Sequence, residues 1–298
     1  MLNEASIVIM YAVTPCHAGS GSALGVVDLP IQRERHTNWP VIQATGVKGA
    51  FRSNYCKSEG NLKTSSIFGI DKDGENKGGW QGACSMSDAK ILAYPMRSNI
   101  APFVWITCPA VLKRFVRDLE AAGKDLKIDS TVFTVEERKA VSLGSETMSG
   151  SVLIEDFEVE VQSKDVIKTE FDKITTEFTI KVAERLLLVS DKAFNYGVTD
   201  CTQIIAQISI DQTTGTTVDG SLRYQEELPS DTIMYSVIYW DKTKDEKNKK
   251  SAKEVQDSVI NVVGSYIQIA GDETCGRGIF KLDWYNPEER KGESNGQE

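Results

Sequence analysis

The sequence predicts an α+β fold in which strands outnumber helices. The residues Ile7–Val13 form an unbroken apolar run, which is typical of a strand buried on both faces. The residues Ser151–Val161 alternate between apolar and acidic side chains, which indicates a half-buried strand. The residues Pro109–Gly123 carry apolar side chains at spacings of three and four between an initial proline and a final glycine, which predicts a helix.

A second helix is predicted in the latter half of Pro40–Lys57. Its apolar side chains, spaced three and four residues apart, are Val47, Ala50, Phe51 and Tyr55. Lys48 and Arg52 are four residues apart and therefore share another face of this helix. The polar, glycine-rich segment at about 60–82 is expected to be a surface loop.

Further strands are expected at Ala89–Tyr94, Leu186–Val189, Ile204–Ile210, Ile233–Trp240 and Val259–Ile269. The segment between Ile210 and Ile233 contains the turn signals Thr214-Gly215 and Asp219-Gly220, so it is predicted to be a hairpin that projects from the body. The mixed-charge run Asp241–Asp257 is expected to be a solvated helix or loop.

The composition sets limits on the class of protein. With 298 residues, 40% hydrophobic and 26% charged, the chain can bury a core and is too apolar to be disordered. Its 34 basic and 43 acidic residues give a formal net charge of -9. This balance argues against binding nucleic acid through bulk positive charge, although it leaves room for a local basic stripe.

The sequence contains neither a membrane-spanning run nor an export signal. The longest apolar runs, Ile7–Val13 and Ile100–Ile106, are far shorter than the ~20 residues that cross a bilayer. The first run lacks the basic flank and the small-residue cleavage site of a signal peptide. We therefore expect a chain that is not exported, located in the cytoplasm.

Cysteine and histidine usage argues against a preformed metal site. None of the six cysteines lies in a Cys-x-x-Cys pair, so the pattern is neither that of a zinc site nor that of a secreted disulfide framework. We expect the cysteines to be small buried apolar residues. With only His17 and His36 present, a histidine-rich metal site is excluded.

One short region reverses the charge of the chain. Between Gln32 and Lys57 the basic residues are Arg33, Arg35, Lys48, Arg52 and Lys57, against the single acidic residue Glu34, a local net charge of +4. Basic side chains at a glycine-bearing helix start favour phosphate binding, since the backbone N–H groups there add to the side-chain charge. An ordinary solvated surface with salt bridges explains the same composition, and both interpretations stay open.

Two residues upstream of this basic region carry the remaining chemistry. Asp28 is either a turn residue before Leu29-Pro30 or a lone carboxylate that holds a divalent cation or orients a proton acceptor. His17 is either an exposed loop residue or a phosphate contact. The loop Ala270–Phe280 has the wrong glycine spacing for a dinucleotide fingerprint; its glycines and Arg277 suit a polymer backbone passing close to the main chain.

These segments together resemble a known family. Gly19–Arg52, GSGSALGVVDLPIQRERHTNWPVIQATGVKGAFR, is similar to the N-terminal region of the RAMP-superfamily backbone subunit of type III-B CRISPR effector complexes, the multi-copy guide-RNA-binding subunit of the Cmr complex. The similarity continues through Lys63–Gly69, Ser87–Ser98, Asp219–Ile238 and Ile269–Trp284, so it covers nearly the whole chain. The string VVDLPIQRERHT is specific to this subunit, whereas the glycine-rich loop is shared across the superfamily.

The resemblance implies a fold and a set of partners. Residues 1–298 would form a single RAMP domain with a ferredoxin-like palm of the RNA-recognition-motif type. Fingers would be inserted at approximately 61–180, a β-hairpin thumb would lie at approximately 200–232, and the C-terminal glycine-rich loop would lie at 270–278. The expected partners are CRISPR guide RNA, target RNA, further copies of the chain in a filament and other type III-B subunits, with no membrane.

The resemblance also implies an activity and its residues. The chain would act in antiviral defence as an endoribonuclease within the assembled complex, cutting target RNA at regular intervals in a metal-dependent attack by the 2′-hydroxyl. Asp28 would be catalytic and is the candidate ligand of Mg²⁺ or Mn²⁺, because a carboxylate by itself is a poor base for an alcohol. RNA binding is assigned to His17, Arg33, Arg35, Lys48, Arg52 and Arg277, and Glu226 and Glu227 are placed at the base of the thumb near the cleavage point. The alternative is a non-catalytic RNA-binding scaffold of the same complex.

Overall fold

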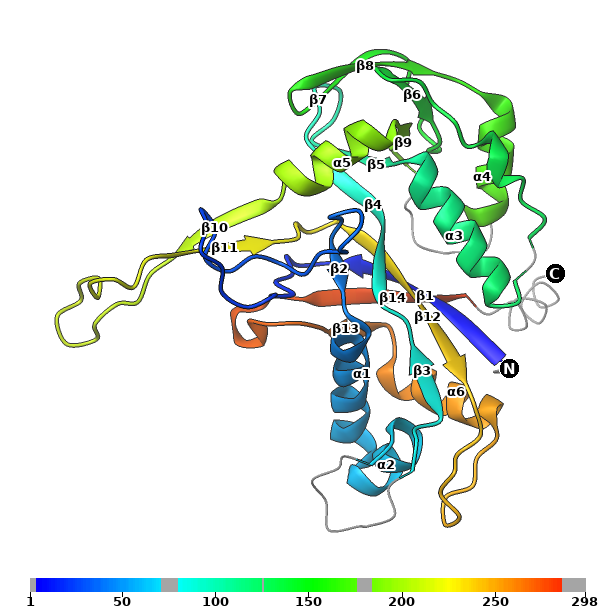
Figure 1. The fold of residues 1–298 in the computed structure, drawn as a ribbon, viewed down its shortest axis with the longest axis vertical. Helices are drawn as coiled ribbons and strands as arrows, with labels where there is room; N and C mark the ends of the chain where they lie inside the picture. Colours follow the sequence, from blue (N-terminus) through cyan, green and yellow to red (C-terminus); the bar gives the residue numbers. More distant parts are fainter. Residues whose placement is uncertain (1–3, 71–79, 125, 176–183, 286–298) are drawn as a thin grey trace, which may run out of the picture.

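The computed structural model describes residues 4–70, 80–124, 126–175 and 184–285. These residues form a sheet of 12 strands in which neighbours follow the order β13-β14-β1-β12-β4-β5-β9-β6-β8-β7, while β2 pairs with β4 and β3 with β12 (Figure 1). A separate ribbon of two antiparallel strands, β10 and β11, projects away from the body. Within the described residues, the parallel pairs of the large sheet are β5–β9 and β6–β8.

The strands are β1 (Glu4–Ala12), β2 (Val41–Ile42), β3 (Cys84–Met86), β4 (Ala89–Met96), β5 (Val104–Thr107), β6 (Lys139–Ser142), β7 (Gly150–Ile154), β8 (Phe157–Gln162), β9 (Leu186–Val189), β10 (Gln203–Gln207), β11 (Arg223–Glu227), β12 (Ile233–Trp240), β13 (Tyr266–Gln268) and β14 (Ile279–Tyr285). The α-helices are α1 (Ala44–Glu59), α2 (Asn61–Phe68), α3 (Pro109–Ala121), α4 (Asp165–Thr175), α5 (Asp191–Asp200) and α6 (Ala252–Val263), with short 3₁₀ turns η1 (Ser130–Val132) and η2 (Glu273–Cys275).

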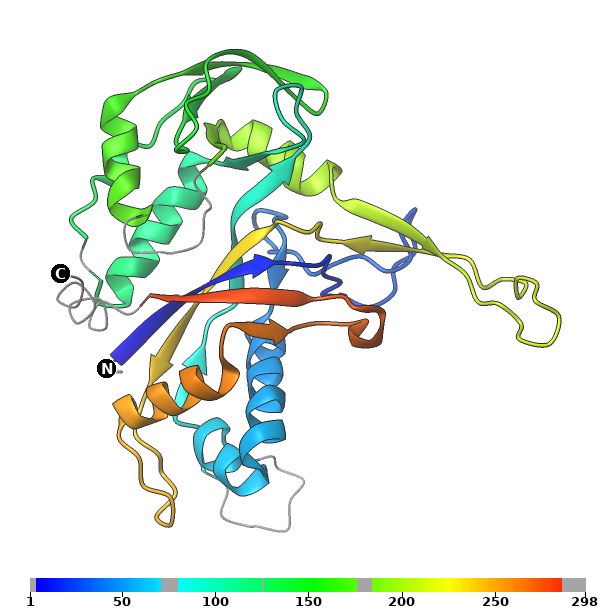
Figure 2. The same ribbon diagram turned by 180° about the vertical axis from the view of Figure 1, so that it is seen from behind.

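Helices cover both faces of the sheet at β1 and β12. Neighbouring residues of a strand point to opposite faces. Ser6 of β1 accepts a hydrogen bond from Gln256 of α6, so α6 lies on the face of the even-numbered residues of β1. Ile9 pairs with Tyr235, whose ring meets the Phe115 ring of α3 edge-on at 4.6 Å. The helix α3 therefore covers the opposite face, and Figure 2 shows the two groups of helices on either side of the strands.

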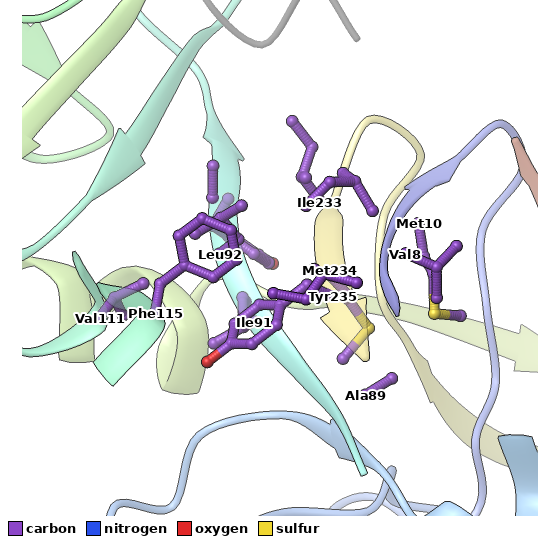
Figure 3. Close-up of a cluster of buried hydrophobic side chains, with 14 of the residues drawn as sticks. Val8, Met10, Ala89, Ile91, Leu92, Val111, Phe115, Ile233, Met234 and Tyr235 are labelled. Atoms are coloured by element: carbon purple, nitrogen blue, oxygen red, sulfur yellow. The ribbon is translucent and has the colours of Figure 1, made fainter. Parts of the chain in front are cut away.

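The buried core is continuous between α3 and the sheet. Figure 3 shows the rings of Phe115 and Tyr235 packed beside the aliphatic side chains of β4 and β12. The Tyr235 hydroxyl donates to Asp118, which also forms an ion pair with Lys90 at 2.6 Å. A buried phenol and a buried carboxylate thus satisfy each other within the apolar layer.

Several predicted elements are confirmed. The strand at Ile7–Val13 is β1, and the helix at Pro109–Gly123 is α3, which begins at Pro109 after Cys108. The helix expected in the second half of Pro40–Lys57 is α1, with Val47, Phe51 and Tyr55 buried. Of the six cysteines, Cys16, Cys84 and Cys108 are buried, whereas Cys56 and Cys201 are partly exposed and Cys275 is exposed.

Other predicted elements are wrong in kind or number. The loop expected at about 60–82 contains α2, and residues 71–79 of that loop lie outside the described residues. Ser151–Val161 is two strands, β7 and β8, because the chain turns at Glu155, which has a positive φ of 49°. The buried residues are Val152 and Ile154 in β7 but Val159 and Val161 in β8, so the alternation shifts by one residue at the turn. Leu153, which a single strand would place on the buried face, is therefore exposed.

The C-terminal part differs most from its prediction. Val259–Ile269 was expected to be one strand, but the first half completes α6 and only Tyr266–Gln268 is extended. Ser251 and Glu254 form a capping box that starts this helix within the mixed-charge run. The apolar side chains at Val255, Val259 and Val263 then fall on one helical face.

The hairpin also closes differently. Its returning strand is β11, whose sequence RYQEE is too polar to signal a strand, and Ile233–Trp240 is β12 in the middle of the large sheet. The strand β4 likewise lies in the large sheet beside β12, although it falls within the range 61–180 expected for inserted fingers.

None of the helices in the described ranges is long and apolar enough to cross a bilayer.

Candidate functional site

Three segments that are far apart in the sequence emerge at one end of the sheet. The strand β1 is antiparallel to both β12 and β14, with Tyr11 opposite Ile233 and Ala12 opposite Phe280. The loop that follows β1, the ribbon that precedes β12 and the glycine-rich loop that precedes β14 must therefore meet. Figure 1 shows both loops close to the base of the ribbon formed by β10 and β11.

Asp28 is fixed against the ribbon. Its Oδ2 accepts a hydrogen bond from the Tyr224 amide of β11 at 2.7 Å, and its own amide donates to the Tyr224 carbonyl at 3.1 Å. Leu29 forms a parallel bridge to Gln225. The loop thus runs along the edge of the ribbon, and the Asp28 side chain is held in place while remaining partly exposed.

His17 lies at the junction of all three segments. Its Nδ1 is 2.7 Å from the Glu226 carbonyl oxygen, so Nδ1 carries the proton that is donated. The His17 carbonyl accepts from the Gly271 amide at 3.1 Å. Its ring packs against Gly19, where a Cβ would come within 2.7 Å of Nε2, so this position requires glycine.

Glu226 joins the loop after β1 to the base of the ribbon. It is 6% exposed, and its carboxylate accepts from the Ile31 amide at 3.0 Å and from Thr202 Oγ1 at 2.7 Å. Arg33 Nη2 lies 2.5 Å from Oε1, and Nη1 of the same guanidinium donates to the carbonyls of Asn38 and Val198. The charges of Arg33 and Glu226 therefore compensate each other inside the protein.

Glu227 joins the other face of the ribbon to the glycine-rich loop. It is fully buried, and its Oε1 accepts from Arg277 Nε at 2.9 Å. The neighbouring Gln225 donates from Nε2 to Asp272 at 2.7 Å. Since consecutive residues of a strand point to opposite faces, Glu226 and Glu227 anchor different loops.

The remaining predicted cations, Lys48, Arg52 and Arg35, have no acidic partner within the described residues. Lys48 Nζ donates to the Cys84 carbonyl at 3.1 Å, and Arg52 Nη1 donates to the Gly69 carbonyl at 3.2 Å. Both acceptors are neutral. Arg35 is exposed, and within the described residues none of the three forms an ion pair. A shallow groove on α1 is lined by Gly49, Arg52, Ser53, Cys56 and Lys57.

The described residues contain no cluster of three or more His, Cys, Asp or Glu side chains that could hold a metal ion. Asp28 nevertheless has a carboxylate oxygen to offer, because Oδ1 takes no hydrogen bond within the described part of the chain. Mg²⁺ commonly binds one or two carboxylates and completes its shell with water and substrate phosphates. A single fixed carboxylate therefore fits a cation that the RNA helps to bind.

The structure brings together His17, Asp28, Arg33, Glu226, Glu227 and Arg277, and it places Lys48 and Arg52 on α1. Sequence reasoning missed Thr202, Gln225 and Asp272, which complete the two networks at the base of the ribbon. Gln225 and Asp272 lie within the segments Asp219–Ile238 and Ile269–Trp284 that resemble the family, whereas Thr202 stands in no recognisable motif. Only the pairing of β10 with β11 brings Thr202 beside Glu226, so no local signal announced it.

Comparison with known proteins agrees with this arrangement. The family model described as the RAMP superfamily matches residues 9–281. The CRISPR system Cmr endoribonuclease Cmr4 of Pyrococcus furiosus is 37% identical over 290 residues, which cover 94% of this chain and 95% of that protein.

Solved structures share the fold. The crystal structure of oligomeric Cmr4 from Pyrococcus furiosus has a TM-score of 0.71 and 30% identity, and the match covers 95% of this chain and 98% of that one. A chain in the cryo-EM structure of the Type III-B Cmr-beta bound to cognate target RNA has a TM-score of 0.75 and 25% identity, covering 94% and 97%. This chain belongs to the RAMP superfamily and, within it, to the family of Cmr4 proteins.

Proposed function

We propose that this chain is the backbone subunit of a type III-B CRISPR ribonucleoprotein in the cytoplasm, and that it cuts target RNA in antiviral defence. Copies of the chain line a guide RNA beside the other subunits of the complex, and each copy cuts the paired target once. The support is the 37% identity, over 94% of the chain, to a protein named as an endoribonuclease. The observation in the structure that carries the proposal is Asp28, a partly exposed carboxylate fixed against a projecting ribbon.

The parts of the fold take their roles in this proposal from the strand order. The succession β1-α1-β4-β12-α6-β14, with neighbours in the order β14-β1-β12-β4, is what a ferredoxin-like palm requires. The ribbon of β10 and β11 is then the thumb. The five strands from β5 to β9, together with α3 and α4, are the fingers, which are inserted between β4 and the thumb.

The proposed reaction needs little covalent chemistry from the protein. The 2′-oxygen of the target loses its proton and bonds to phosphorus while the bond from phosphorus to the 5′-oxygen breaks, and that oxygen gains a proton. The products are a 2′,3′-cyclic phosphate and a 5′-hydroxyl. Holding these atoms in line contributes roughly 7–11 kcal/mol. Stacked A-form RNA prevents this alignment, so the thumb acts by displacing one nucleotide.

Asp28 is the residue that holds a divalent cation in this proposal, Mg²⁺ in the first place and Mn²⁺ as the alternative. When bound, the cation supplies positive charge where negative charge develops on the phosphate oxygens. Asp28 itself is held by the Tyr224 amide, so its carboxylate is oriented before RNA arrives.

Guide binding is assigned to the cations that are not neutralised. Lys48 and Arg52 lie on the same side of α1 and donate only to neutral carbonyls, so their full charge acts on a phosphate backbone. Arg35, which is exposed beside the loop of Asp28, belongs to the same group. Sequence specificity comes from base pairing with the guide, so no base-reading residue is required.

The test replaces Asp28 in the assembled complex. Asp28→Asn keeps an oxygen for the Tyr224 amide and removes the charge, so the loop stays in place while cation binding is lost. We expect loss of target cuts with guide and target binding unchanged, measured by gel analysis of end-labelled target RNA. We also expect a chelator to stop cutting by the unmodified complex.

A matched control is Glu246→Gln, which removes one carboxylate from an exposed pair with Lys249. It lies in the loop between β12 and α6, away from the thumb, and should cut normally. Undiminished cutting by the Asp28→Asn complex would contradict the catalytic assignment. Intact target RNA with every variant and with the unmodified complex would favour the non-catalytic scaffold instead.

A further inference from the structure

Arg33 is engaged inside the protein through both of its terminal nitrogens, although its charge suggested an RNA contact. The side chain of Arg33 is 16% exposed, and the side chain of its partner Glu226 is 8% exposed. Nη1 donates to the carbonyls of Asn38 and Val198 at 2.8 and 2.9 Å, and Nη2 bonds Glu226. A phosphate would have to displace these partners and leave a carboxylate buried without its counter-charge, which is costly.

The contacts of Arg33 continue without a break to Asp28. Glu226 bonds Arg33 and the Ile31 amide through its side chain, and its own amide donates to the Leu29 carbonyl at 3.0 Å. Asp28 and Leu29 in turn bond the carbonyl of Tyr224, two residues earlier on β11. The segment from residue 28 to residue 33 is thus pinned to one edge of the thumb, and the ion pair closes its C-terminal end.

We propose that Arg33, through its ion pair with Glu226, is a positioning residue for the cutting reaction and does not contact RNA. The pair fixes the loop of Asp28 to the base of the thumb, so the carboxylate and the element that displaces the nucleotide move as one unit. This inference rests on the proposed function, because it needs Asp28 to act in the cutting step.

The physical reason is that the backbone bonds at Asp28 and Leu29 lie at an exposed end of the loop. Bonds of that kind open easily when nothing buried holds the segment next to them. The buried ion pair supplies that hold a few residues further along. An error of about 1 Å in a reacting group can lower a rate by roughly 100-fold.

The test is Arg33→Met in the assembled complex, with cutting measured in a single turnover at saturating target. We expect the rate to fall roughly tenfold to 100-fold, with target affinity and its salt dependence unchanged. Arg33→Lys should recover part of the rate, since it restores a charge for Glu226 but fewer donors. Thr202→Val, which removes another donor to Glu226, should give a smaller loss in the same direction.

Lys90→Met is the matched control. Lys90 and Asp118 form an ion pair of similar exposure, 21% and 10%, between β4 and α3. Its loss should lower the melting temperature about as much as the loss of Arg33, but leave the cutting rate of the folded complex unchanged. Equal rate losses in the two variants would reduce Arg33 to general stability and overturn the proposal.

Other outcomes are distinguishable. A direct RNA contact would lower target or guide affinity and reduce the slope of log affinity against log salt by about 0.7, with the saturated rate intact, which also overturns the proposal. If Asp28→Asn abolishes cutting while Arg33→Met and Arg33→Lys cut normally, the positioning role fails and the proposed function stands. If Asp28→Asn cuts normally, the proposed function fails first. Equal losses in Arg33→Met, Glu226→Gln and the double variant would support one shared role.

Discussion

The basic residues at this end of the molecule fall into two groups with different physical states. Arg33 and Arg277 are paired with the buried glutamates Glu226 and Glu227. Lys48 and Arg52 donate to the neutral carbonyls of Cys84 and Gly69 and form no ion pair within the described residues. Residue type alone does not separate the two groups, and the sequence places Arg33 in one basic region with Lys48 and Arg52.

The difference shows that basic side chains at one end of the molecule are either paired with buried carboxylates or left without an acidic partner. The paired cations hold two loops against the ribbon of β10 and β11, where a buried charge is stable only beside its counter-charge. The unpaired cations lie on α1, where water and phosphate are accessible. Each of the following predictions either separates the two groups further or shows that the division is false.

The largest expected effect is on stability, in Arg277→Met. This change leaves the fully buried Glu227 without its ion-pair partner, so we expect the free energy of unfolding to fall by about 3 kcal/mol. Denaturant unfolding of the chain alone would measure it. The effect would disappear if Arg277 served RNA binding and contributed nothing to the folded protein.

A control for this variant removes a cation on α1 that pairs with Glu273 of the same loop. Lys57→Met breaks the pair between Lys57 and Glu273, in which both side chains are more than half exposed at 69% and 62%. Exposed pairs contribute roughly 0.2–1 kcal/mol. A loss as large as that of Arg277→Met would show that burial does not distinguish the two pairs.

The second effect is on guide affinity, in Lys48→Met and Arg52→Met. Each removes one unpaired charge, so the slope of log affinity against log salt should fall by roughly 0.7 per residue. Titration of guide RNA at several salt concentrations would measure it. Lys113→Met, at an exposed position of α3, should leave the slope unchanged; an equal change there would mean that any surface lysine counts.

The smallest expected effect is on stability at alkaline pH. It involves the thiol of Cys16, which lies near Glu227, and the thiol of Cys84, which lies near Lys48. Burial, followed by the charge of Glu227, raises the pKa of Cys16 to about 12. Burial also raises the pKa of Cys84 to about 11, opposed by the charge of Lys48. Because the unfolded thiol releases its proton near pH 9 and the folded one does not, stability is complete below about pH 9 and is lost as the pH rises towards 12.

Unfolding of Cys16→Ala at two pH values would measure this effect. Between pH 8 and pH 10 the wild-type chain should lose about 1 kcal/mol more than the variant. The exposed Cys275 serves as the control, since Cys275→Ala should keep the wild-type pH dependence. Identical pH dependence in all three proteins would contradict the burial of the Cys16 thiol.

Local patterns predicted the elements that depend on local physics. The apolar run at β1 and the helical spacing in α1 and α3 survive in the structure because burial of one face decides both the element and its partner. The pattern failed where a turn shifts the alternation by one residue, as at Glu155 between β7 and β8. It failed again where a polar strand is held by pairing, as in β11, whose glutamates are buried and matched by arginines.

The sequence by itself determined the apolar segments and the basic region, because residue type and spacing are properties of the chain. Its resemblance to a known family then singled out Asp28, Lys48 and Arg52 as candidate residues. Only the tertiary structure decided which of the basic side chains are paired with a carboxylate and which are not. That choice depends on the register of β1 against β12 and β14, which brings Glu226 and Glu227 beside loops distant from them in sequence. The partners of these ion pairs are far apart in the sequence, so no local spacing predicts them.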